Sequence, residues 1–250
     1  KLLKLGYKVA IADQVEDPSQ AKGLVKRDIV QFYTPGCIDE LEGLESDKAN
    51  YLAAIYEEPK YKKWTVCVCD ISTGELRLGN VSTESELFSI LGQFRPREII
   101  LRKFIEEDIK QKLSSIDDLN QLSYAHLSES LLRDCNEQKK LLKGVFSSEK
   151  LDTLPCGQVL GGRELVATVL KYLNELCVNH TQFLTINPLL DHDSMIIDNT
   201  ARRDLELFET SRRRELKGSL FKEINKTRTP MGARLLRSAL ATPLVCNHSI

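Results

Sequence analysis

Three short apolar runs crowd into residues 51–78, and their spacing limits what the chain can fold into. Each run has a length typical of a strand, and the first two are rich in apolar residues. The runs are Tyr51–Tyr56, Trp64–Ile71 and Glu75–Leu78. The turns between them, Pro59–Lys63 and Ser72–Gly74, are so short that we expect hairpins and three antiparallel strands.

A helix and a further strand follow these runs directly. We predict a helix over Glu84–Gln93 with Thr83 as its N-cap, and then a strand over Glu98–Leu101. Strand, helix and strand in succession indicate a mixed sheet. Further helices are expected over Phe104–Lys112, Ser128–Leu142 and Glu164–Cys177. We therefore assign an α/β domain with a mixed sheet to residues 48–183.

The segment before this domain reads as the end of another α/β unit. A predicted helix ends at Gly6, and two predicted strands follow over Tyr7–Ala12 and Asp28–Tyr33. The chain opens at a lysine inside that helix, without an initiator methionine, which suggests a fragment. We assign residues 1–37 to this unit. Residues 38–47 hold five acidic side chains and little large apolar content, which predicts an exposed linker.

The pattern changes again after Pro188, where helix signals dominate. The expected elements are a short strand over Met195–Ile197, an Asn199-capped helix over Thr200–Glu209, and a helix that begins at Pro230 behind an N-cap at Thr229. Residues 184–250 therefore read as the start of a helical domain. The chain as a whole is predicted to be α/β followed by all-α.

The overall charge gives no sign of nucleic-acid or membrane binding, because 35 Lys and Arg balance 36 Asp and Glu. No apolar run approaches the ~20 residues that span a bilayer. One loop gathers Lys22, Lys26 and Arg27, a cluster that can contact phosphate, although a solvated loop is the alternative. Residues 200–237 carry eleven basic and five acidic side chains. We favour ion pairs within and between helices there over a nucleic-acid-binding face.

Asp70 is the one candidate for metal chemistry, since it closes an apolar strand as a metal-binding carboxylate does in ribonuclease H-like enzymes. Two-metal catalysis needs several converging carboxylates, and no second acid stands at an equivalent strand end. We favour a structural role in which Asp70 accepts hydrogen bonds from the following turn. Phosphate-loop, dinucleotide, serine-hydrolase and zinc-protease motifs are missing, so we expect no catalytic residue, cofactor or metal in this chain.

The seven cysteines are odd in number and form no CxxC pair, which is typical of a reduced intracellular protein. Cys67 and Cys69 lie two residues apart in a predicted strand, so their side chains face the same side of the sheet. We expect both to be small buried core residues and not metal ligands.

Four ordered blocks of this sequence resemble the MutS family of DNA mismatch-repair proteins. They are Gly6–Pro18 with Val25–Val30 and Thr34–Gly36; Asp70–Glu75; Met195–Asp198 with Thr200–Glu206; and Thr229–Leu236. The resemblance runs the length of the chain, although residues from about 106 to 160 resemble the family only in general character and contain none of these blocks. It implies the end of a mismatch-binding domain, an acidic linker, a ribonuclease H-like connector without catalytic acids, and the first helices of a core domain.

The resemblance also implies a function. The intact protein would be a dimeric clamp that binds mismatched double-stranded DNA, exchanges ADP for ATP with magnesium at an ATPase domain absent here, and recruits a MutL-type partner through the connector. Arg27 matches a family position near DNA, with Lys26 and Lys22 as weaker neighbours. This chain would be a non-catalytic scaffold. Its location would be the cytoplasm or nucleoid of a bacterium, or the nucleus or an organelle of a eukaryote.

Two readings from other classes remain open on the sequence. One is a ribonuclease H-like metal-dependent nuclease that uses Asp70, which requires further carboxylates within metal reach of it. The other is a general nucleic-acid-binding module that uses the arginine-rich stretch of residues 200–237.

Overall fold

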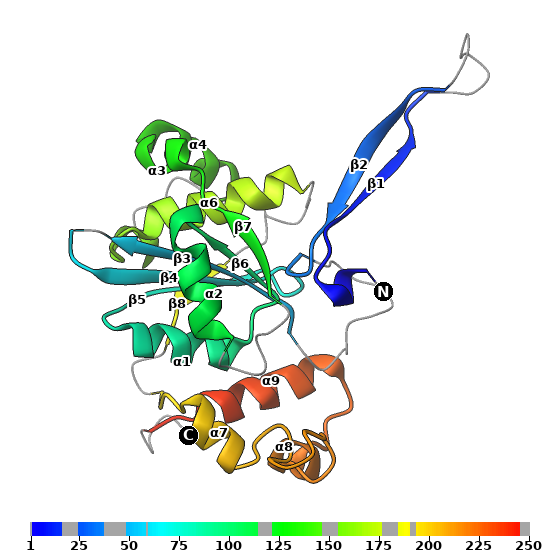
Figure 1. Ribbon diagram of the computed structural model, residues 1–250, viewed down its shortest axis with the longest axis vertical. Coiled ribbons are helices and arrows are strands. Elements are labelled where there is room, and N and C mark those ends of the chain that lie inside the picture. Colours follow the sequence, from blue (N-terminus) through cyan, green and yellow to red (C-terminus); the bar gives the residue numbers. More distant parts are fainter. Residues whose placement is uncertain are drawn as a thin grey trace.

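The chain forms a projecting arm, a sheet covered by helices, and a layer of C-terminal helices, as the computed structural model shows (Figure 1). The structure describes residues 2–16, 25–37, 49–58, 60–114, 122–146, 155–176, 185–190 and 194–245. The predicted acidic linker, residues 38–47, and Lys22 lie outside the described residues. The expected mixed α/β composition is confirmed.

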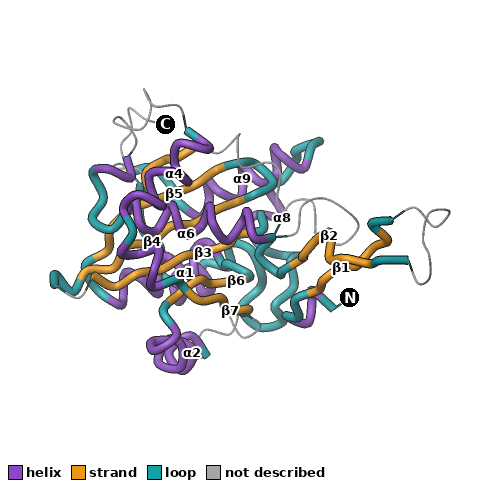
Figure 2. Tube along the Cα trace, turned by 90° about the horizontal axis from the view of Figure 1, so that it is seen from above, coloured by secondary structure: helices purple, strands orange, loops and turns teal. Residues whose placement is uncertain are grey.

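The arm is a two-stranded antiparallel ribbon of β1 (Val9–Gln14) and β2 (Arg27–Tyr33). A 3-10 turn over Leu3–Leu5 leads into it and ends at Gly6, whose φ of 81° is a left-handed conformation that favours glycine. Most side chains of the ribbon are exposed, because no other described element packs along it. Seen from above, it projects sideways beyond the sheet and helices (Figure 2).

The sheet has six strands in the order β7-β6-β3-β4-β5-β8. The strands are β3 (Tyr51–Glu58), β4 (Lys63–Asp70), β5 (Glu75–Val81), β6 (Glu98–Leu101), β7 (Ser123–His126) and β8 (Thr185–Pro188). The first three form the predicted antiparallel hairpins. The other three pair in parallel, β6 with β3, β7 with β6 and β8 with β5, so the predicted mixed sheet is confirmed.

Helices cover both faces of the sheet because β4, at its centre, is apolar on both faces. Val66 and Val68 point to a core shared with α1 (Glu84–Phe94) and α2 (Glu106–Leu113). Cys67 and Cys69 point the other way, as predicted, into a core shared with α6 (Gly162–Glu175) and α4 (Cys135–Val145). Each buried residue of this size stabilises the fold by about 1.5–3 kcal/mol.

Several predicted bounds were wrong for local reasons. The helix predicted over residues 128–142 is two helices, α3 (Glu129–Arg133) and α4, because the Asp134 carboxylate accepts hydrogen bonds from the backbone N–H groups of Asn136 and Glu137 and starts a new helix. Phe104 lies in a 3-10 turn, Lys103–Ile105, that precedes α2. A further 3-10 turn, Pro155–Gly157, precedes α6. The sheet continues past residue 183, since β8 pairs with Glu75–Leu78.

The C-terminal layer holds α7 (Asn199–Asp204), α8 (Leu220–Ile224) and α9 (Pro230–Ala241). The strand predicted over Met195–Ile197 is wrong, because the described chain forms only an isolated antiparallel bridge there, between Ser194 and Leu244. The N-cap of α7 is Asp198, not Asn199. Thr229 caps α9 as predicted.

None of the helices in the described ranges is long and apolar enough to cross a membrane.

The N-cap of α9 gives a stability prediction. The Thr229 hydroxyl accepts a hydrogen bond of 3.1 Å from the Gly232 N–H. Thr229→Ala removes that acceptor and should lower the free energy of unfolding by about 1 kcal/mol. Thr229→Ser keeps the hydroxyl and is the matched control. Chemical denaturation of the variants measures the effect, and equal losses for both would show that the hydroxyl does not cap the helix.

Candidate nucleic-acid interface

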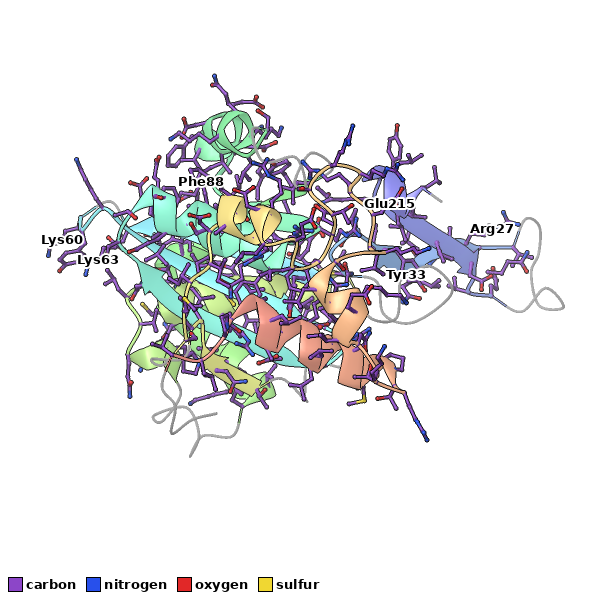
Figure 3. All side chains as sticks on the ribbon, turned by 90° about the horizontal axis from the view of Figure 1, so that it is seen from below. Arg27, Tyr33, Lys60, Lys63, Phe88 and Glu215 are labelled. Carbon is purple, nitrogen blue, oxygen red and sulfur yellow. The ribbon has the colours of Figure 1, made fainter. Side chains whose placement is uncertain are left out.

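The outer end of the arm carries two of the three basic residues that the sequence singles out. Arg27 begins β2 and pairs in register with Gln14 at the end of β1, and Figure 3 shows it far from the sheet. Lys26 precedes it, and its N–H donates to a Glu16 carboxylate oxygen 3.2 Å away. Both side chains are exposed. The structure therefore brings Lys26 and Arg27 together, while Lys22 lies outside the described residues.

Two acids near Arg27 each accept a hydrogen bond from the backbone N–H of the next residue. The Asp28 carboxylate accepts from the Ile29 N–H at 2.8 Å, and the Asp13 carboxylate accepts from the Gln14 N–H at 2.7 Å. Within the described ranges no carboxylate forms an ion pair with Arg27. Its guanidinium can therefore meet a phosphate, which is the strong partner of an exposed arginine.

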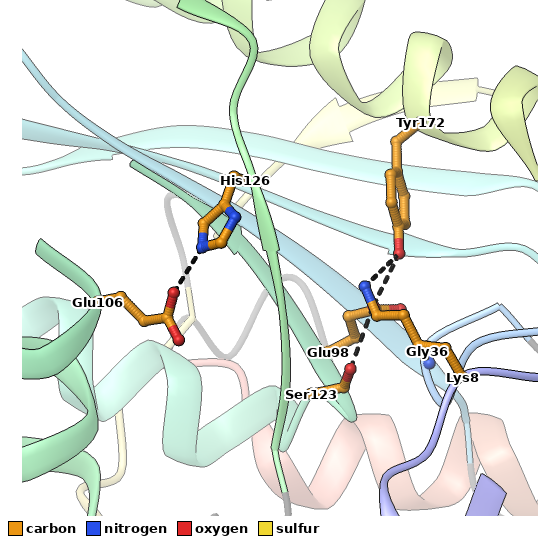
Figure 4. Close-up of polar contacts among 7 residues, drawn as sticks. All are labelled: Lys8, Gly36, Glu98, Glu106, Ser123, His126 and Tyr172. Carbon is orange, nitrogen blue, oxygen red and sulfur yellow. Dashed lines mark hydrogen bonds and ion pairs between the residues drawn. The ribbon is translucent and has the colours of Figure 1, made fainter. Parts of the chain in front are cut away.

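The base of the arm is held by a buried carboxylate, Glu98, the first residue of β6. Its side chain has an exposed fraction of 0%. The Tyr172 hydroxyl of α6 donates to it at 2.7 Å, and the Lys8 ammonium lies 3.0 Å from it (Figure 4). The Ser123 hydroxyl and the Gly36 N–H approach it at 3.4 Å each. Glu98 thus connects the residue before β1 and the segment after β2, which together form the base of the arm, to strands β6 and β7 and to helix α6.

Burying a charged carboxylate destabilises the fold by several kcal/mol unless the group is ion-paired and hydrogen-bonded. Lys8 supplies the charge and also donates to the Tyr172 hydroxyl at 3.2 Å. Burial and the Glu98 charge raise the pKa of Tyr172 far above its ordinary value, so the phenol keeps its proton and remains a donor. A Cβ at Gly36 would lie 2.7 Å from the Glu98 Cβ, so only glycine fits there without a shift.

Sequence reasoning missed Glu98. The available signal was an acid at the start of a short, fully buried strand, a position where an acid requires a partner. Its partners lie far away in sequence, with 62 positions to Gly36 and 74 to Tyr172. No local pattern links them.

Asp70 has the structural role that the sequence predicted. Its carboxylate accepts hydrogen bonds from the Ser72 N–H at 3.0 Å and from the Ser72 hydroxyl at 2.6 Å. Burial raises its pKa, and the Ser72 hydrogen bonds oppose that rise. Among the described residues no group of three or more His, Cys, Asp or Glu could hold a metal ion. The nuclease reading, which required such a group around Asp70, has no support here.

Three arginines of the C-terminal layer make contacts within the protein. Arg202 is buried and donates to the backbone carbonyl of Gly92 at 2.9 Å, which ties α7 to α1. The Arg237 guanidinium lies over the rings of Phe208 and Phe221, 4.9 and 4.3 Å from their centroids. Arg214 pairs with Glu209 at 3.4 Å. Of these contacts, only the Arg214–Glu209 pair is an ion pair of the predicted kind, while Arg212, Arg213 and Arg228 of the same stretch are exposed.

Three family models match the chain in order: MutS domain I over residues 1–42, MutS domain II over residues 50–183 and MutS domain III over residues 200–250. A DNA mismatch repair protein MutS from Caldanaerobacter subterraneus subsp. tengcongensis is 34% identical over 260 residues. One from Clostridium tetani is 35% identical over 251 residues. Both alignments cover 100% of this chain but only 28% and 27% of the relative. The chain spans about a quarter of the length of these curated relatives.

The Glu98 site gives a prediction that separates charge pairing from packing. Lys8→Met leaves the buried carboxylate without its cation and should destabilise the fold by about 2 kcal/mol. In a Glu98→Gln background the same change should cost little, because a neutral amide needs no counter-charge. A double-mutant cycle of unfolding free energies measures the coupling. Additive effects of the two changes would mean that the ion pair does not hold the arm.

Proposed function

The chain belongs to the MutS family, and from that premise we propose that it is the part of a DNA mismatch-repair protein that joins a DNA-contacting arm to a helical core. In this proposal residues 1–37 complete the mismatch-binding domain, residues 38–47 are a linker, and residues 48–183 are the connector, whose sheet strand β8 completes. The core begins after β8. The order and extent of the three matching family models support this division.

We propose a ribonuclease H-like fold for the connector. Three antiparallel strands, β3 to β5, precede two strands, β6 and β7, that pair in parallel on the β3 side and are reached through α1 and α2. The resemblance to the family implies a connector without catalytic acids. Its role is then that of a scaffold.

The DNA contact is proposed for Arg27 and Lys26, with Lys22, which lies outside the described residues, as a third candidate. The observation that carries this is an exposed guanidinium at the end of an arm that projects away from the body (Figure 3). Backbone and side-chain donors to phosphate position a protein on a duplex without reading its sequence. The arm would therefore orient the DNA, and mispair readout would need other residues.

The rest of the function is proposed for the intact protein. It would bind mismatched double-stranded DNA, use ATP and magnesium at a domain outside this chain, pair with a second MutS subunit and recruit a MutL-type partner through the connector. The relatives named above are bacterial, which supports a place in the cytoplasm or nucleoid.

The test is charge reversal at the end of the arm in the intact protein. Arg27→Glu should weaken binding to matched and mismatched duplexes by a similar factor of about ten, and lower the slope of log affinity against log salt by about one to two. Fluorescence anisotropy across a salt series measures both quantities.

Lys63→Glu is the matched control, because Lys63 lies on a hairpin at the opposite end of the molecule (Figure 3) and should leave binding unchanged. A loss confined to the mismatched duplex would contradict a phosphate contact. Equal losses for both variants would mean that only the overall charge matters.

A further inference from the structure

A cavity of about 500 Å³ lies between the ends of strands β3, β4 and β5 and helix α9. Its sheet side comes from the start of β3, the end of β4, the start of β5 and the segment from Gln93 to Arg97. Its other side comes from α9 and from Phe208 and Glu209. Nothing in the proposed DNA contact uses this cavity, which lies at the junction of two structural layers. Its volume is within the range of small-molecule sites.

The lining has a positive balance. Six arginines line the cavity against three acids, Asp70, Glu75 and Glu209. Arg77 pairs with Glu75 at 3.0 Å, and Arg234 donates to the neutral Ser72 hydroxyl at 2.8 Å. Because six guanidinium groups outnumber three carboxylates here, an anion that enters this space meets a favourable potential.

The lining also contains aromatic and apolar side chains. Tyr51 and Phe94 form an edge-to-face pair with ring centroids 5.3 Å apart. Phe208 and the exposed side chain of Leu235 add further apolar surface. A ligand with a flat ring gains contact area and stacking against such a wall. The cavity therefore suits a molecule that combines a ring with an anionic group.

The side-chain amide of Gln93 narrows the class of ligand that fits the cavity. It is the penultimate residue of α1 and lines the cavity with an exposed fraction of only 8%. Among the residues that the structure describes, neither its amide nitrogen nor its amide oxygen has a hydrogen-bond partner. Buried polar atoms are bonded in the great majority of cases, so this amide requires a partner from outside the described chain. An amide that offers a donor and an acceptor together matches the edge of a purine base.

We propose that this cavity binds a nucleoside monophosphate, with the base against Tyr51 and Phe94, its edge on the Gln93 amide, and the phosphate at the arginines. Arg97 is the arginine best suited to meet the phosphate at the mouth, because its side chain is exposed while its backbone is fixed. Its N–H donates to the Tyr51 carbonyl at 2.9 Å, and its carbonyl accepts from Ser123 at 3.0 Å. The proposed nucleotide site is separate from the arm, and it does not depend on the DNA contact proposed for Arg27 and Lys26.

The experiment is isothermal titration calorimetry of the 250-residue chain with deoxyadenosine 5′-monophosphate, and separately with inorganic phosphate. Saturable binding of one nucleotide per chain is expected, tighter than that of phosphate alone. Gln93→Met keeps the side-chain length but removes the amide, and should weaken nucleotide binding about tenfold while leaving phosphate binding unchanged. Arg97→Gln should weaken the binding of both ligands.

Lys63→Gln, which removes an exposed lysine far from the cavity, is the control and should change nothing. Thermal melting checks that each variant is folded, and Gln93→Met should not unfold the chain because it removes an unpartnered buried amide. The proposal is overturned if no saturable nucleotide binding occurs in the unmodified chain, or if both cavity variants bind as it does. Phosphate binding alone, with no gain from the base, overturns the assignment to a nucleotide.

Discussion

Strand β4 is apolar on both faces, and this constraint organises the rest of the sheet domain. A strand with Val66 and Val68 on one side and Cys67 and Cys69 on the other cannot lie at a solvated surface. It needs neighbours on both edges, which β3 and β5 supply, and helices on both faces, which α1 and α6 supply. The parallel strands then follow, because a helix that crosses one face returns the chain to the sheet edge in the same direction.

Polar interactions enter where this sheet domain meets its neighbours. At the arm, Lys8, Gly36 and Tyr172 all contact the buried carboxylate of Glu98. The direction of the ribbon therefore depends on the need of a buried charge for an ion-pair partner and hydrogen-bond donors. At the C-terminal layer, Arg202 reaches the backbone of α1 at Gly92, where a Cβ would lie 2.1 Å from the Asn199 side chain. Directional contacts of this kind fix orientation more strictly than apolar packing, because each partner must occupy one position.

This arrangement suits a scaffold that holds separate working parts in register. The arm places Arg27 away from the body (Figure 3), and the sheet domain contacts both the arm and the C-terminal layer. The cavity beside α9 lies where the ends of strands β3, β4 and β5 meet the C-terminal layer. A ligand there would contact both layers at once, and its binding energy would add to the contacts that already hold them together.

The sequence by itself determined the features that depend on near neighbours. Alternation within Trp64–Ile71 predicted which side chains share a face, Thr83 and Thr229 marked helix starts, and Asp70 followed by Ser72 predicted a turn. Local reasoning failed where two similar signals competed, as at Asp198 and Asn199, or where an extra cap divided a helix, as at Asp134. Only the tertiary structure decided the Glu98 site and the Gln93 cavity. Their partners come from distant segments, and a contact between distant residues is set by how strands and helices stack and not by local spacing.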